Sequence, residues 1–173
     1  APASHCRLVV VNLDEISMGR SGRVIDRERE VAIHDLIAAN SFAPIGQVDG
    51  PYALNLSLEG NRLVFDIRLA DGMPVIAHVL SLTPFKRIVK DYFLICESYE
   101  QALRVSAPER IEAIDMGRRG LHDEGANILR EALERKVAMD FDTARRLFTL
   151  ICVLHWRSEE HTSELQSHLN LVC

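Results

Sequence analysis

The residues best suited to chemistry lie in one segment, MGRRGLHDEG at positions 116–125. Arg118 and Arg119 are consecutive, and His122 follows four and three positions later, so all three would share one face of a helix. A guanidinium presents a fork of N–H donors that fits a phosphate or a carboxylate. The glycines in the segment would let a ligand approach the backbone closely. The segment therefore predicts an anion-binding site.

The same residues also have a purely structural interpretation. Arg118 and Arg119 could pair with nearby acids, namely Asp115, Asp123 or Glu124. The glycines could instead allow two helices to pack closely. Both interpretations remain open from the sequence.

Other basic residues stand at loop ends and helix starts. Arg20 lies in a GRSGR loop whose N–H groups could wrap an anion, or which could be a flexible surface loop. Arg87 and Lys90 could contribute charge at a helix start, or form a solvated stripe. If two or three of these segments converge in space, they would form an anion pocket although the formal net charge is −5.

Arg145 and Arg146 are expected in the first turn of the last helix, where a cation opposes the helix dipole. A local rule broken in this way can mark a site. The neighbouring acids Asp140 and Asp142 could also simply neutralise the two arginines.

No pattern indicates a metal, a cofactor or a catalytic nucleophile. Cys152 and His155 are three residues apart in an apolar helical pattern without a second pair of ligands, which favours core residues over zinc ligands. No serine stands in a nucleophile elbow, and no cysteine has a base at telling spacing. We therefore predict no metal site and no cofactor.

Composition narrows the class of protein. The chain has 173 residues, the length of one domain, and its net charge of −5 gives no electrostatic footprint for nucleic acid. The longest apolar run, residues 147–156, is about half a membrane span, so no membrane segment is expected. No signal peptide is recognisable at the N-terminus. The four cysteines lack paired spacing, which favours a reducing, cytoplasmic setting.

Four segments read as strands. Residues 7–13 form a β-branched run, and residues 52–58 and 63–69 alternate between apolar and polar side chains. Short Gly-containing turns link these two to each other and to residues 75–82, which predicts antiparallel hairpins with one buried face. Residues 75–82 are apolar at nearly every position, so we expect both faces of that strand to be covered.

Four helices are expected between and after these strands. Asp26 should cap a helix to about residue 40, and Thr83 should cap a largely apolar helix that reaches residue 104. Pro108 should begin a third helix, to about residue 136, with a kink, a break or a close helix contact near its glycines.

Asp142 should cap the last helix, residues 143–156, which carries no charge between Arg146 and Arg157 and should be buried on nearly all sides. Together the elements predict an α+β fold: a mainly antiparallel sheet of about four strands with three to four helices packed largely on one face. The first strand should join that sheet.

Several long blocks closely resemble a small bacterial family, catalogued as uncharacterised protein family 0262 (UPF 0262). The resemblance covers about residues 7–157 and implies a bacterial cytosolic setting, but no reaction, substrate or cofactor, so it assigns no functional residue. The blocks that carry it are SFAP (41–44), RLVFDIR (62–68), LSLTPFKRIVKDYFLICESY (80–99), IEAIDMGRRGLHDEGA (111–126) and DFDTARRLFTLICVLHW (140–156).

The end of the chain differs in kind. Residues 157–167, RSEEHTSELQS, resemble the in-frame translation of a sequencing adaptor. We therefore expect one α+β domain at residues 1–157 and a non-native or disordered tail at residues 158–173.

Two functions remain open. The first is a non-enzymatic binding or regulatory module that holds a small anion or a protein partner on the surface around Arg118, Arg119 and His122. The second is a small enzyme acting on a phosphorylated or carboxylated metabolite, with His122 as acid or base. The enzyme requires a concave pocket that holds His122, at least two of these arginines and a carboxylate. The oligomeric state is not indicated.

Overall fold

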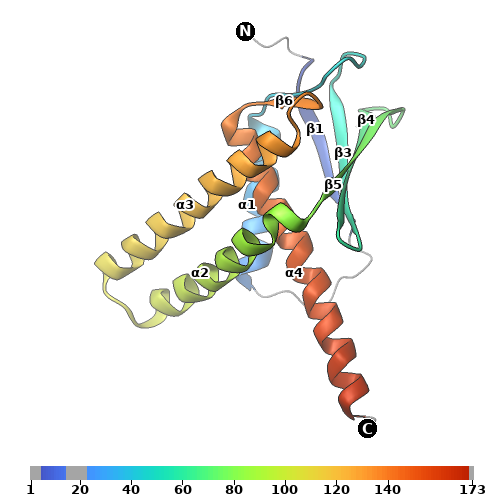
Figure 1. Ribbon diagram of the computed structural model, residues 1–173. Helices are drawn as coiled ribbons and strands as arrows, with labels where there is room; N and C mark the ends of the chain where they lie inside the picture. The colour runs from blue at the N-terminus through green and yellow to red at the C-terminus, as the bar shows by residue number, and fades with distance from the viewer. Residues whose placement is uncertain (1–4, 15–22, 172–173) are drawn as a thin grey trace.

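The computed structural model describes residues 5–14 and 23–171, with side chains for 5–14 and 26–156. It has an α+β fold, as predicted, with the helices gathered on one side of the main sheet (Figure 1). The strands are β1 (Leu8–Leu13), β2 (Phe42–Pro44), β3 (Tyr52–Glu59), β4 (Arg62–Leu69), β5 (Pro74–Ser81) and β6 (Val137–Met139). The helices are α1 (Arg23–Ala38), the short 3₁₀ turn η1 (Thr83–Phe85), α2 (Lys86–Val105), α3 (Pro108–Ala132) and α4 (Phe141–Leu171).

The main sheet has the strand order β1-β3-β4-β5. The two predicted hairpins are confirmed, since β3, β4 and β5 pair antiparallel, and Gly60 and Gly72 supply the positive φ angles of their turns. β1 joins the sheet as predicted, parallel to β3. A second, two-stranded sheet of β2 and β6 was not predicted, because three-residue strands are too short to show alternation.

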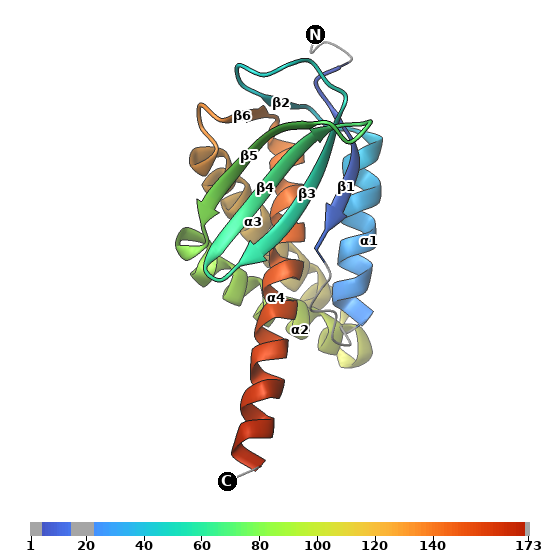
Figure 2. The same cartoon turned by 90° about the vertical axis from the view of Figure 1, so that its right-hand side faces the viewer.

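The prediction that both faces of the strand at residues 75–82 are covered is wrong. β5 forms the edge of the sheet, and Val79 on it is 50% exposed. The helices lie behind the sheet in Figure 2, which leaves its other face uncovered. A continuous apolar run therefore does not by itself distinguish an edge strand from a central one.

The expected buried helix is confirmed in α4. Every residue from Leu147 to Leu154 is at most 5% exposed, and the helix passes between the sheet and the helices α2 and α3 (Figure 1), with α1 beside it behind β1 (Figure 2). α4 continues to Leu171 instead of ending near Trp156, over a stretch that contains no Gly or Pro. The nature of residues 158–173 stays a prediction. No helix in the described part of the chain is long and apolar enough to cross a membrane.

Three of the expected helix caps are wrong. Asp140, not Asp142, caps α4: its Oδ1 accepts a hydrogen bond from the Thr143 N–H at 2.9 Å, because it stands just before the first helical residue. Thr83 lies inside η1 and accepts a hydrogen bond from the side chain of Asn61 instead. Asp26 lies in the first turn of α1, which begins at Arg23.

α3 runs without a break past its three glycines and ends at Ala132, before the residues that pair as β6. Of the expected outcomes, the close helix contact is the one observed. A Cβ at Gly125 would overlap the ring of Phe148 on α4, and one at Gly117 would lie 2.7 Å from Cδ1 of Ile95 on α2. A Cβ at Gly120 would meet nothing within 4 Å.

Two glycine variants therefore have opposite expected effects on stability. Gly125→Ala should lower the free energy of unfolding by about 1–2 kcal/mol, because overlap with Phe148 outweighs the gain in helix propensity. Gly120→Ala should raise it by up to about 1 kcal/mol. Urea denaturation measures both, and equal shifts in the two variants would contradict the close packing at Gly125.

Candidate functional site

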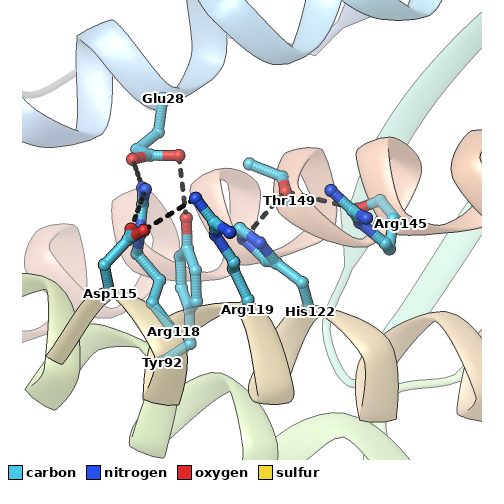
Figure 3. A network of polar contacts seen from close by, with 8 residues as sticks. All are labelled: Glu28, Tyr92, Asp115, Arg118, Arg119, His122, Arg145 and Thr149. Atoms are coloured by element: carbon cyan, nitrogen blue, oxygen red, sulfur yellow. Dashed lines mark hydrogen bonds and ion pairs between the residues drawn. The ribbon is translucent and has the colours of Figure 1, made fainter. Parts of the chain in front are cut away.

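A cavity of about 710 Å³ opens among α1, the last turns of α2, the middle of α3 and the first turns of α4. Figure 3 shows the polar groups that α1, α3 and α4 bring together there. The lining contains six arginines against three carboxylates, so its charge is positive although the chain is acidic. The residues that line it are Arg27, Glu28, Val31, Ala32, Asp35, Tyr99, Glu100, Leu103, Arg104, Arg118, Arg119, His122, Arg145, Arg146 and Thr149.

Arg118 on α3 is held by two carboxylates. Its Nη1 donates to Glu28 on α1, and its Nη2 and Nε donate to Oδ1 of Asp115 at 2.7 and 3.2 Å. The Tyr92 hydroxyl donates to the other oxygen of Glu28 at 3.3 Å, and the Arg118 guanidinium lies 5.0 Å from the centre of the Tyr99 ring. The three charged side chains are each about 20% exposed, so this network is largely shielded from water.

The network shifts the titration of its members. Burial opposes the charge of Arg118, but Glu28 and Asp115 outweigh it and raise the pKa of that guanidinium. The hydrogen bond from Arg118 lowers the pKa of Asp115. The structural interpretation therefore describes Arg118 well, because its donors on all three nitrogens are already engaged.

Arg119 differs from its neighbour. Its side chain is 71% exposed, and its one ion pair in the described structure joins Nη2 to Oδ2 of Asp115 at 3.0 Å. Asp115 is thus shared between two arginines, and most donors of Arg119 remain available to a ligand.

His122 lies beside Arg119, one turn along α3 (Figure 3). Its ring packs on Tyr92, with centroids 5.1 Å apart, and its Nε2 lies 3.3 Å from Oγ1 of Thr149 on α4. Burial, followed by the charges of Arg118 and Arg145, lowers the pKa of His122 to about 4. The imidazole is therefore neutral near pH 7.

Arg145 and Arg146 enter the cavity from α4. They lie in the second turn of that helix, not the first, because α4 begins at Phe141. Among the residues that the structure describes, Arg145 has only long ion pairs, at 4.0 Å to Asp123 and 3.8 Å to Asp142. Arg146 donates to the carbonyl oxygen of Ala39 at 3.0 Å. Asp142 thus offsets Arg145 only weakly, while Asp140 caps the helix.

Two of the four predicted basic segments meet in this cavity, the one around Arg118 and the one around Arg145. Arg87 and Lys90 do not line it; Arg87 lies 3.8 Å from both Asp91 and Glu124 on the outer surface. Arg20 falls outside the described residues.

We did not predict Glu28 and Thr149 as site residues from the sequence. Glu28 lies 90 residues before Arg118, and no local pattern along the chain reveals their contact. Thr149 stands in the buried run of α4, one helical turn after Arg145, and that spacing is the one signal that could have found it. Among the side chains that the structure describes, no group of three His, Cys, Asp or Glu residues could hold a metal ion.

A family model matches residues 5–157, and its description is "Uncharacterised protein family (UPF0262)". The chain belongs to this family. A UPF0262 protein of Rhodopseudomonas palustris strain TIE-1 is 62% identical over 154 residues, which span 89% of this chain and 94% of the relative. A UPF0262 protein of Nitrobacter winogradskyi is also 62% identical over 154 residues, spanning 89% and 92%. No solved structure matches the chain. The family resemblance that we inferred from the sequence is therefore confirmed.

The low pKa of His122 predicts how stability depends on pH. Unfolded histidine takes up a proton near its ordinary pKa of 6.5, whereas folded His122 does so only near 4. The free energy of unfolding should therefore fall as the pH drops from about 6.5 to about 4, by up to about 3 kcal/mol from this residue.

His122→Gln should remove most of that fall in urea denaturation at pH 7, 6, 5 and 4. His34→Gln is the matched control, because the His34 side chain is 84% exposed and lies outside the cavity, and it should retain the fall that His122 causes. An equal pH dependence in the wild type and in His122→Gln would contradict the neutral, buried ring.

Proposed function

We propose that this protein is a non-enzymatic binding module that holds a small anion between Arg119 and Arg145. The observation that carries the proposal is the cavity into which α3 and α4 each bring arginines with unused donors. A phosphate or carboxylate there would accept charge-assisted hydrogen bonds from two sides. The neutral pair of His122 and Thr149 would form the floor between them.

The division of charge in the pocket supports this proposal. Glu28 and Asp115 already engage Arg118, so they compete little with an anionic ligand for Arg145. Among the described residues, Arg119 pairs through one nitrogen with Asp115, and Arg145 has only long ion pairs. Both guanidinium groups can therefore still attract an anionic ligand. We therefore favour a small anion over the other predicted ligand, a protein partner, because the unused donors line a concave space.

The enzyme hypothesis has weaker support, although the cavity does contain His122, several arginines and a carboxylate. An acid or base for catalysis near neutral pH needs a pKa close to 7, and that of His122 is about 4. Glu28, one of the carboxylates that line the cavity, already accepts hydrogen bonds from Arg118 and Tyr92.

We also propose a cytoplasmic setting. Cys6, Cys96 and Cys152 are free thiols, and Cys96 and Cys152 are buried in neighbouring helices, where burial raises the pKa of both. Unpaired cysteines of this kind are typical of a reducing compartment.

Isothermal titration calorimetry with inorganic phosphate tests the proposed function. Arg119→Gln and Arg145→Gln should each weaken phosphate binding about tenfold or more, because each removes a charge-assisted contact. Arg130→Gln is the matched control: it removes an exposed arginine of α3 outside the cavity and should leave the affinity unchanged. The absence of binding by both phosphate and a simple carboxylate such as acetate, or equal weakening by all three variants, would overturn the proposal.

A further inference from the structure

The lining of the cavity also contains apolar side chains. Val31 on α1 is 48% exposed and Leu103 on α2 is 56% exposed, and both line the cavity with Ala32 and Tyr99. Single exposed apolar side chains are common on protein surfaces. Two large ones from different helices, facing one cavity beside a cluster of arginines, are suited to a ligand with an apolar part.

The cavity is also too large for a bare inorganic anion. Its volume of about 710 Å³ lies in the range of sites for small organic molecules, roughly 300–1,000 Å³. Along α1 its lining extends from Arg27 to Asp35, which is about 12 Å of helix. The ligand should therefore be elongated.

Arg146 and Leu103 lie toward opposite ends of this space, and Arg27 and Arg104 also line the end near Leu103. Arg146 marks the end near the C-terminus of α1, because it donates to the carbonyl oxygen of Ala39. Leu103 marks the other end, near the first turns of α1. It follows Tyr99 by one turn of α2, and the ring of Tyr99 lies against Arg118. Arg118 in turn donates to Glu28 in the first turns of α1. Val31 stands between the two ends.

We infer that the ligand is an amphipathic organic acid. Its carboxylate or phosphate head lies between Arg119 and Arg145, and its apolar body extends past Val31 toward Leu103. The body removes both side chains from water, which contributes free energy that an inorganic anion cannot supply. This inference rests on the proposed function and adds the chemical class of the ligand.

Straight-chain carboxylates provide the test. Acetate, butyrate, hexanoate and octanoate share one head group and differ only in apolar length. Full burial of a methylene contributes about 0.8 kcal/mol, or about fourfold in affinity, so calorimetry should show a gain of about two- to fourfold per methylene until the cavity is filled.

Variants of the apolar lining residues show where the gain in affinity with chain length arises. Val31→Gln and Leu103→Gln should remove most of the dependence on chain length and leave acetate binding unchanged. Leu94→Gln is the matched control, because Leu94 is 54% exposed on α2 but lies outside the cavity, and it should keep the full dependence. Arg145→Gln should weaken all four acids by a similar factor. All three apolar positions are exposed, so the variants should fold.

The outcomes separate the two proposals. If the acids bind through Arg145 without a gain with chain length, or if Leu94→Gln removes the gain as Val31→Gln does, the amphipathic class is overturned and the anion site stands. If neither phosphate nor any acid binds, both proposals fail.

Vesicles distinguish a free acid from a membrane lipid with the same chemistry. Sedimentation with phosphatidylglycerol vesicles, against phosphatidylcholine vesicles, should leave the protein in the supernatant, as a free acid predicts. Sedimentation with the anionic vesicles that Val31→Gln and Leu103→Gln abolish would support the amphipathic class with a lipid as its source. Sedimentation that these variants do not change would contradict it.

Discussion

The candidate site depends on one largely shielded guanidinium. Arg118 joins α3 to α1 through Glu28 and is itself fixed by Asp115 on its own helix. Removing one member of such a network would leave an uncompensated charge in a poorly solvated place, which costs far more than losing a surface ion pair. The network thus links α1 to α3 beside the cavity that opens among the helices.

The same network decides which arginines can serve a ligand. Because Arg118 engages Glu28 and shares Asp115 with Arg119, these acids leave Arg145 and most donors of Arg119 available to a ligand. A protein with a formal net charge of −5 can in this way present a positive cavity. The deciding quantity is the local balance of paired and unpaired charge, not the sum over the chain.

The sequence predicted what depends on local pattern and missed what depends on distant contacts. Alternating side chains identified β3 and β4, and the uncharged run at residues 147–156 predicted the buried part of α4. The position of β5 at an edge and the contact between Glu28 and Arg118 depend on which elements become neighbours. The spacing of residues along the chain does not show which elements become neighbours. Until the fold was known, Arg118 could therefore be either a ligand-binding or a structural residue.

Arginine side-chain NMR during a phosphate titration tests this account most directly, because it follows each ¹⁵Nε–¹Hε group separately. The account predicts that the signals of Arg119 and Arg145 shift with saturable dependence on phosphate, while that of Arg118 stays fixed by Asp115. A shift of Arg118 as large as those of Arg119 and Arg145, or no shift of any of the three, would contradict it.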